Sequence, residues 1–453
     1  MAKKQSVRYV CSNCGAFATS WAGKCQQCGA WNTLQEELVL ENSTGGLATG
    51  GGRVLQAAAV GMATQHDQKR LITAMDDVDT VLGGGVVAGS VTLIAGQPGI
   101  GKSTLLLQLA DAVAKNHNVL YVSGEESAHQ VGLRAERLGV SPSSKLQLAT
   151  SNSAEDITTS VDTKAYDLVI VDSIQTVSVA AISSAAGSVA QITNSTQLIL
   201  AAAKQSNTAV ILVGHVTKEG AIAGPKVLEH VVDVVLQLEG DRYGGFKVLR
   251  ATKNRFGPTS EAGIFEMAEK GLQPVTNPSA ALLEERQASD GSVVLATLEG
   301  TRPLLVEVQA LVNKTSYGYP KRAASGIDLN RVNLLVAMLE RRTKLSLSDQ
   351  DIYVNIVGGM RITEPAADLA VCMAIGSAAK GLQLKSNAVV FGEVGLSGEV
   401  RHVPYIEKRI AEAKKLGFEA AISPLQKQGK KDSFLQGVRD VRSALNQFLE
   451  KDA

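Results

Sequence analysis

A single nine-residue stretch constrains this chain more than any other feature. Residues 96–104 read Gly-Gln-Pro-Gly-Ile-Gly-Lys-Ser-Thr, which matches the phosphate-binding P-loop pattern G-x-x-x-x-G-K-[ST]. The apolar run Val91–Ala95 before it predicts a buried strand, and Leu105–Val113 after it predicts a helix. A phosphate at this turn would meet backbone N–H groups and a helix N-terminus, both electropositive. The stretch therefore predicts a nucleoside-triphosphate site; the alternative is a plain glycine-rich turn.

The residue types of this stretch assign roles within the predicted site. Lys102 is expected to reach the β- and γ-phosphates, and the Ser103 hydroxyl is expected to ligate Mg²⁺. The cofactor is therefore expected to be a nucleoside triphosphate with Mg²⁺, and the family resemblance given below implies ATP. The predicted nucleotide-binding residues are Gly96, Gln97, Pro98, Gly99, Ile100, Gly101, Lys102, Ser103 and Thr104.

Composition bounds the class of protein. At 453 residues, the chain is long enough for two or three domains. Its formal charge of +1 means that any nucleic-acid surface must be a local patch. No apolar run approaches the roughly 18–20 residues of a membrane span, and Met1–Gln5 lacks the apolar core of a signal peptide. We therefore expect a cytoplasmic location and no membrane partner.

Four of the five cysteines lie within the first 28 residues. Cys11 and Cys14 form one C-x-x-C pair, and Cys25 and Cys28 form another ten residues later. Two such pairs can place four thiolates around one tetrahedral Zn²⁺, which leaves no open position for catalysis and indicates a structural site. The alternatives are disulfides, which a cytosolic setting disfavours, or a redox pair, which lacks the usual βαβ surroundings. Metal binding would supply the folding energy of so small a module.

Beyond the P-loop, short apolar strands alternate with helical stretches. Strands are expected at residues 119–123, 168–172 and 209–213, a helix at 195–205, and a hairpin of strands 234–238 and 247–252. Continuous apolar strands separated by helices predict a mostly parallel α/β sheet covered on both faces. After Pro274 a second α/β region is expected, with strands near 293–298, 304–312 and 353–357 and helices at 329–341, 366–379 and 406–416.

Carboxylates follow two of the predicted strands. Asp172 ends the apolar run 168–171 and fits a Walker B ligand of Mg²⁺ or its water. Glu125 and Glu126 follow strand 119–123, which we expect beside the P-loop strand; either could orient and deprotonate the attacking water. Glu125 is slightly favoured, and the alternative for both is the acidic first turn of a helix.

Basic and imidazole groups complete the predicted site. His215 follows strand 209–213 and could sense the γ-phosphate; a capping or core histidine is the alternative. Lys253 and Arg255 are two residues apart and so share one face of a strand. An arginine supplied by a neighbouring subunit could stabilise transition-state charge, whereas the alternative is a solvated basic edge.

Together these motifs resemble a RecA-type ATPase and, more closely, the bacterial RadA (Sms) family. The order is a four-cysteine module, the P-loop, Ser-Gly-Glu-Glu-Ser at 123–127 and Lys-Asn-Arg-Phe-Gly at 253–257, the last being distinctive of that family. The resemblance covers essentially the whole chain. It implies an ATP-driven helicase on single-stranded and branched DNA, a homo-hexamer that promotes branch migration with the recombinase RecA. Similarity to DnaB helicases implies that Lys253 and Arg255 act across the subunit interface.

The resemblance also divides the chain. It implies a zinc module at residues 1–35, a glycine-rich linker at 36–68, a RecA-like ATPase domain at 69–275 and a Lon-protease-like domain at 285–453. Lon proteases use a serine and a lysine, but Ala366 and Glu407 stand at the matching positions here. Without a hydroxyl nucleophile and its base no acyl-enzyme can form, so we expect a proteolytically inactive scaffold.

DNA contacts are expected on loops. Tyr317–Arg322 combines aromatic and basic residues suited to nucleic acid, although a merely solvated loop would look the same. Val177–Val189 and Lys218–Lys226 are candidates for loops facing a ring centre. Two competing functions stay open at this point: an ATP-dependent protease or remodelling ring, and a nucleotide-gated scaffold that binds DNA and RecA without moving along DNA.

Overall fold

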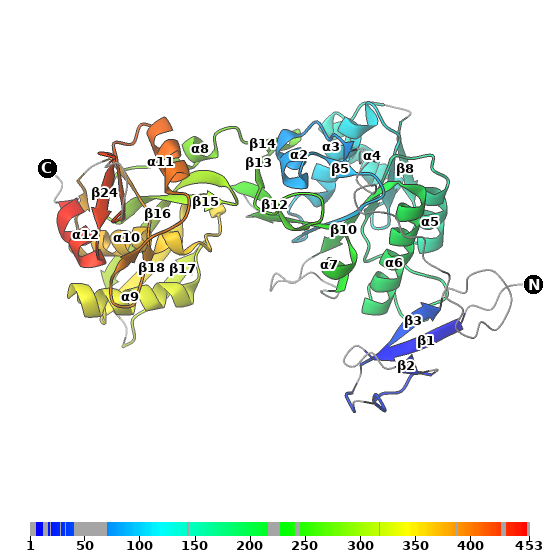
Figure 1. Ribbon diagram of the computed structural model, residues 1–453, viewed down its shortest axis with the longest axis horizontal. Helices are drawn as coiled ribbons and strands as arrows, with labels where there is room; N and C mark the ends of the chain where they lie inside the picture. The colour runs from blue at the N-terminus through cyan, green and yellow to red at the C-terminus, as the bar shows by residue number, and fades with distance from the viewer. Residues whose placement is uncertain are drawn as a thin grey trace, which may run out of the picture. The chain divides into compact units, whose positions relative to one another are not determined.

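The computed structural model describes residues 6–11, 17–18, 20–27, 29–31, 33–39, 70–142, 145–215, 227–240, 245–316, 318–385, 387–426 and 432–450 (Figure 1). Its contacts divide the chain into two compact units. The first contains Met1–Leu238, Ala251–Thr259 and Ala268–Leu272, and the second contains Glu239–Arg250, Ser260–Met267 and Gln273–Ala453. No described helix is long and apolar enough to cross a membrane.

The N-terminal module is a small antiparallel sheet. Its strands are β1 (Ser6–Cys11), β2 (Phe17–Ala18) and β3 (Leu34–Val39), in the order β2-β1-β3. Cys11 and Cys25 are buried and form a small cluster with Leu34. Such a core is too small to support folding alone, as expected for a metal-dependent module. Cys14 and Cys28 lie outside the described residues, as does most of the predicted linker.

A nine-stranded sheet carries the P-loop. Its strand order is β14-β13-β12-β11-β6-β10-β9-β7-β8, and the strands from β11 to β8 in that order are parallel. The bounds are β6 (Val91–Gly96), β7 (Val119–Ser123), β8 (Leu146–Thr150), β9 (Leu168–Asp172), β10 (Ala209–His215), β11 (Val234–Gly240), β12 (Phe246–Asn254), β13 (Ala262–Ala268) and β14 (Gly271–Pro274). The expected mostly parallel sheet is confirmed.

Helices cover both faces of this sheet. They are α2 (Asp76–Leu82), α3 (Lys102–Ala114), α4 (Ala128–Leu138), α5 (Ala154–Asp162), α6 (Val189–Ser206) and α7 (Val227–Val231); β4 (Arg70–Leu71) and β5 (Val86–Val87) pair nearby. One buried cluster joins α5 and α6 to alternate residues of the strands, such as Val122 and Val171. None of the buried leucines of α3 belongs to that cluster, which places α3 on the opposite face.

One expectation about strand order is wrong. Strand 119–123, which is β7, does not lie beside the P-loop strand β6, because β10 and β9 lie between them. The neighbour of β6 is β10, and His215 is opposite Gly96 in their register. Sequence order does not fix spatial order in a parallel sheet, since each crossover helix can skip strands.

The second unit contains a seven-stranded sheet in the order β17-β18-β16-β15-β20-β23-β24. Its strands are β15 (Ser292–Glu299), β16 (Arg302–Lys314), β17 (Arg322–Ser325), β18 (Gln350–Ile356), β20 (Ala388–Val390), β23 (Ala420–Pro424) and β24 (Leu435–Val438). Its helices are α8 (Pro278–Leu283), α9 (Leu329–Thr343), α10 (Asp368–Lys380), α11 (Ile406–Lys415) and α12 (Val441–Phe448). Short 3₁₀ turns span Val357–Gly359 and Pro365–Ala367, and minor strand pairs join β19 (Gln383–Leu384) to β25 (Leu449–Glu450) and β21 (Glu393–Val394) to β22 (Val400–Arg401).

The core of this unit packs around α10, which is buried along almost its whole length. Cys372 lies within it, fully buried, and burial raises the pKa of its thiol. The strands and helices expected after Pro274 are confirmed.

Candidate active site

The P-loop connects β6 to α3, and its backbone requires glycine at both ends. A Cβ at Gly96 would lie 2.6 Å from the carbonyl oxygen of Leu238 on the adjacent strand β11. Gly101 has a φ of 115°, a conformation that other residues rarely adopt, and it directly precedes the first residue of α3. The first turn of α3 therefore presents its N–H groups at the loop, where an anion can bind them.

Lys102 is buried against the loop that it serves. Its side chain is 4% exposed, and Nζ donates hydrogen bonds to the carbonyl oxygens of Gly96 (2.8 Å) and Gln97 (3.1 Å). Burial lowers its pKa to about 8, and the nearby Asp172 and Glu125 carboxylates partly offset that effect. The ammonium group therefore lies between phosphate-binding backbone and acidic side chains, as a lysine that reaches the phosphates must.

The predicted catalytic side chains converge at the carboxyl edge of the parallel strands. Asp172 ends β9 and His215 ends the neighbouring β10, while Glu125 lies two residues beyond β7. The His215 Nε2–H donates to Glu125 Oε1 across 3.1 Å, and the Ser173 hydroxyl donates to the same oxygen. Ligands of open α/β sheets bind at this edge. The structure thus brings three of the sequence-predicted residues into one site.

Glu125 and Glu126 have different environments. The hydrogen bond from His215 holds the pKa of the Glu125 carboxyl at about 2. Glu126 instead accepts two hydrogen bonds from Arg134 on α4, at 2.7 and 2.5 Å. The Glu126 carboxylate is neutralised by its partner, whereas Glu125 lies with Asp172 and Lys102 at the nucleotide edge. The geometry favours Glu125 as the group that orients water.

The donor set fits a Mg²⁺–nucleotide. Asp172 and Ser103 supply the hard oxygen ligands that Mg²⁺ prefers, and Lys102 and the α3 N-terminus supply the positive charge that phosphates need. A buried polar atom also lacks a partner here: Nδ1 of His215 forms no hydrogen bond with any described residue. These residues would hold ATP and Mg²⁺ at the sheet edge.

Lys253 and Arg255 are held within their own subunit. Lys253 Nζ donates to the carbonyl oxygens of Glu229 (2.8 Å), His230 (3.2 Å) and Val232 (2.8 Å) at the C-terminal end of α7. The Arg255 guanidinium pairs with the buried Asp233 carboxylate at 2.9 Å, yet half of the Arg255 side chain is exposed. The structure therefore places neither residue against Glu125 or Asp172 of the same chain.

Other residues of the 253–257 motif contact the end of α2. The Asn254 side-chain amide donates to the carbonyl oxygens of Val81 (3.4 Å) and Leu82 (3.2 Å) at the end of α2. A Cβ at Gly83 would lie 2.9 Å from Gly257 Cα, so the two backbones touch. The motif joins α2 and α7, a structural role that its sequence did not reveal.

The residue at the position that matches the catalytic serine of Lon proteases is buried. Ala366 is 1% exposed and carries only a methyl group. Nearby, the fully buried guanidinium of Arg409 pairs with Glu364, donates to the Ala296 carbonyl oxygen at 2.7 Å, and lies two residues beyond Glu407. Sequence reasoning missed the Arg409–Glu364 pair, because a single arginine in an amphipathic helix gives no sign of burial.

The candidate DNA loops are only partly described. Residues 177–188 form a loop that Gln191 holds through Val179, Ile182 and Ser184 (2.8–3.3 Å). The Lys218–Lys226 segment and Tyr317 lie outside the described residues. Lys321 is exposed and Arg322 half-buried at the start of β17.

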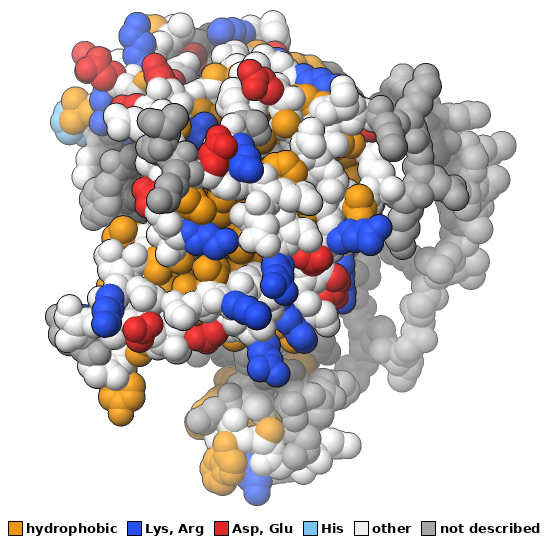
Figure 2. All heavy atoms as spheres, turned by 90° about the vertical axis from the view of Figure 1, so that its left-hand side faces the viewer, with side chains coloured by type: hydrophobic (Ala, Val, Ile, Leu, Met, Phe, Trp, Pro, Cys, Tyr) orange, Lys and Arg blue, Asp and Glu red, His pale blue; other side chains and the backbone are white. Residues whose placement is uncertain are grey.

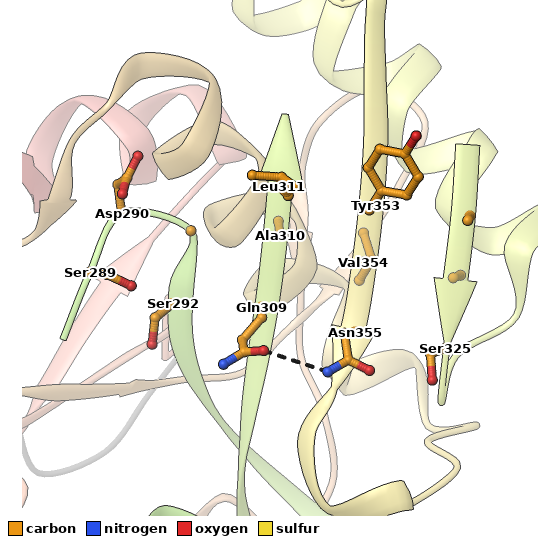
Figure 3. Close-up of a pocket in the computed structure, with 13 residues that line it drawn as sticks. Ser289, Asp290, Ser292, Gln309, Ala310, Leu311, Ser325, Tyr353, Val354 and Asn355 are labelled. Carbon is orange, nitrogen blue, oxygen red and sulfur yellow. Dashed lines mark hydrogen bonds between the residues drawn. The ribbon is translucent and has the colours of Figure 1, made fainter. Parts of the chain in front are cut away.

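One pocket lies on the second unit. It holds about 490 Å³ over strands β15 to β18 (Figure 3). Its labelled wall includes Tyr353, Leu311 and a weak hydrogen bond from Asn355 Nδ2 to Gln309 Oε1 at 3.5 Å. No residue predicted from the sequence as catalytic or ligand-binding lines it.

Parts of the chain, and nearly its whole length, match known proteins. Residues 62–221 match the family described as AAA domain, residues 9–36 match the rubredoxin metal binding domain, and residues 328–427 match subunit ChlI of Mg-chelatase. DNA repair protein RadA of Listeria monocytogenes serovar 1/2a is 46% identical, with 99% of this chain and 100% of that protein covered. The protein of the same name from Pseudomonas aeruginosa is 48% identical, with 94% of each covered. A crystal structure of the RadB recombinase aligns with 45% of this chain and 99% of its own, at 24% identity and a TM-score of 0.36.

The sheet, the P-loop and the carboxyl-edge residues define a RecA-like P-loop ATPase core. An N-terminal zinc ribbon and a C-terminal α/β domain that matches subunit ChlI of Mg-chelatase accompany it, so the expected fold class is confirmed. At this identity over nearly its full length, the chain belongs to the family of the bacterial DNA repair protein RadA.

Proposed function

We propose that this chain is a DNA-stimulated ATPase that moves on single-stranded and branched DNA and promotes branch migration with RecA. The observation that carries the proposal is the convergence of Lys102, Asp172 and the Glu125–His215 pair at one sheet edge. Binding alone needs only the P-loop and a Mg²⁺ ligand. A carboxylate held ionised by histidine at the same edge is suited to hydrolysis.

Each residue of the proposed site has its own role in hydrolysis. Lys102 would exchange its two loop carbonyls for the phosphates. Ser103 and Asp172 would hold Mg²⁺, which would supply charge neutralisation for the transferring phosphoryl group. Glu125 orients the attacking water; its low pKa makes it a positioning group more than a strong base. His215 binds Glu125 and ends the strand beside β6, so it lies where a change at the γ-phosphate would be felt.

The proposal includes a homo-hexamer in the cytoplasm whose sites are completed by the next subunit. The exposed half of the Arg255 side chain supports such a role. Zn²⁺ would be held by Cys11, Cys14, Cys25 and Cys28, and the burial of Cys11 and Cys25 supports that site. Lysine and arginine side chains gather on the face of the second unit turned toward the viewer in Figure 2, which supports salt-dependent contact with DNA phosphates.

Fork-DNA unwinding tests the proposed motor. Lys102→Ala is expected to lose ATP hydrolysis by at least about 10²-fold, and unwinding with it, because phosphate charge is no longer neutralised. Lys253→Ala is expected to lose unwinding as well. Lys204→Ala, an exposed residue of α6, is the matched control and should behave as wild type. A wild-type protein that hydrolyses ATP on DNA yet never unwinds a fork or migrates a branch would refute the motor and favour a nucleotide-gated scaffold.

Nucleotide affinity is expected to fall above about pH 8. The lowered pKa of Lys102 means that the nucleotide-free protein loses this proton as the pH rises through about 8, and phosphate binding must then restore it. The dissociation constant of a fluorescent ADP analogue should therefore rise by up to about tenfold per pH unit above this value. Lys102→Arg keeps its charge and should show a flat profile over the same range; parallel profiles for both proteins would contradict the assignment.

A further inference from the structure

The Mg²⁺-ligating carboxylate has a buried partner that the sequence did not single out. Tyr121, in the middle of β7, is 1% exposed, and its hydroxyl donates to Asp172 Oδ2 at 2.6 Å. This is a short, charge-assisted hydrogen bond, the stronger kind. We propose that Tyr121 is the positioning residue that fixes the orientation of the Asp172 carboxylate for Mg²⁺; this rests on the proposed ATPase function.

The sheet register explains how the two groups meet. Tyr121 is opposite Ile170 of β9, and Asp172 lies two residues beyond Ile170 on the same face. The alternate residues Leu120 and Val122 belong to the cluster on the other face, with α5 and α6. Tyr121 and Asp172 therefore share the face that α3 covers, the helix that begins with Lys102 and Ser103.

The Tyr121 hydrogen bond gives the two oxygens of the Asp172 carboxylate different roles. An ionised carboxylate can accept about four hydrogen bonds, and rotation of its terminal torsion exchanges the oxygens. Tyr121 holds Oδ2, whereas Oδ1 accepts no hydrogen bond from the described part of the chain. With rotation restrained, Oδ1 is kept for Mg²⁺ or a water that it holds.

The tyrosine hydroxyl is a dependable donor. A phenol hydroxyl has an ordinary pKa of about 10, so it keeps its proton throughout the neutral range and can donate to the Asp172 carboxylate. Arg134, which binds Glu126, also acts electrostatically on Tyr121. Glu126, the residue after Glu125, is therefore linked through Arg134 to the surroundings of Asp172.

Outer-sphere partners of metal ligands typically contribute 10–100-fold to metal affinity. Tyr121→Phe removes only the hydroxyl and leaves the ring to fill its place in the core. The Mg²⁺ concentration that gives half of the Mg²⁺-dependent gain in nucleotide affinity is expected to rise about 10–100-fold. Nucleotide affinity in EDTA is expected to stay within about twofold of wild type, since the P-loop is untouched.

Calorimetric titration of ADP at a series of Mg²⁺ concentrations tests this, with thermal melting of each protein in EDTA alongside. Tyr166→Phe is the matched control, because that hydroxyl donates to Gln147 at 2.7 Å on the surface and should not matter. In an Asp172→Asn background, Tyr121→Phe should cause no further change in the Mg²⁺ requirement, whereas a purely structural role would give the same loss in both backgrounds. An unchanged Mg²⁺ requirement in Tyr121→Phe overturns the inference alone. A wild type whose nucleotide affinity ignores Mg²⁺ overturns the proposed ATPase chemistry together with it.

Discussion

Glu125→Gln is expected to lower kcat for ATP hydrolysis by at least about 10²-fold, because a misplaced attacking water costs about that much. Glutamine keeps the size of the side chain and an oxygen that can accept from His215 and Ser173. It loses the negative charge that draws and orients the attacking water. Because the P-loop is unchanged, nucleotide affinity should stay close to that of wild type, so kcat should carry the loss.

Glu126→Gln is the control that the structure offers. Its carboxylate binds Arg134 and lies one residue away from the Glu125 contacts. We expect it to retain most of the ATPase activity, measured by phosphate release under saturating ATP and DNA. Equal losses in the two variants, or a larger loss at Glu126, would contradict the role of Glu125 in orienting the water.

Arg409→Met is expected to lower the free energy of unfolding of the C-terminal domain by about 3–5 kcal/mol. The Arg409 side chain is fully buried, and its removal leaves the Glu364 carboxylate without its cation in a low-dielectric site. Loss of one partner of a buried pair costs more than loss of both, because the remaining charge has no compensation. Urea unfolding followed by calorimetry or fluorescence measures the change.

The double variant Arg409→Met with Glu364→Leu separates charge from packing. It should recover a substantial part of the lost stability, because no unpaired charge remains. Arg401→Met breaks the exposed pair with Glu399 and should leave the midpoint of the urea unfolding transition unchanged. A single variant as stable as wild type would mean that the buried pair does not hold this domain together.

Most of the fold could be predicted because strong local patterns mark it. The P-loop fixed a strand and a helix, and continuous apolar runs identified β7, β9 and β10. The order of those strands could not be predicted, since nothing in the apolar run 119–123 says whether its neighbour is β6 or β9. The wrong strand order did not change the predicted position of the site, because all parallel strands end at the same edge of the sheet.

The site could be predicted at the level of residue types but not of pairings. Glu125 and Glu126 are adjacent in sequence, and their contacts separate them: Glu125 binds His215 and Ser173, whereas Glu126 binds Arg134. Tyr121 looked like an ordinary buried strand residue, since a sequence does not show where a hydroxyl points. The family resemblance implied that Lys253 acts across a subunit interface. Its contacts with the carbonyl oxygens of Glu229 and Val232, at the end of α7, could not be predicted from the sequence.

The burial of Ala366 disfavours peptidase chemistry at this position. A hydroxyl added at this 1% exposed position would face packed core rather than a peptide substrate. Glu407, at the position that matches the Lon lysine, is exposed, so a lysine placed there would be solvated. Ala366→Ser together with Glu407→Lys is therefore expected to give no peptidase activity.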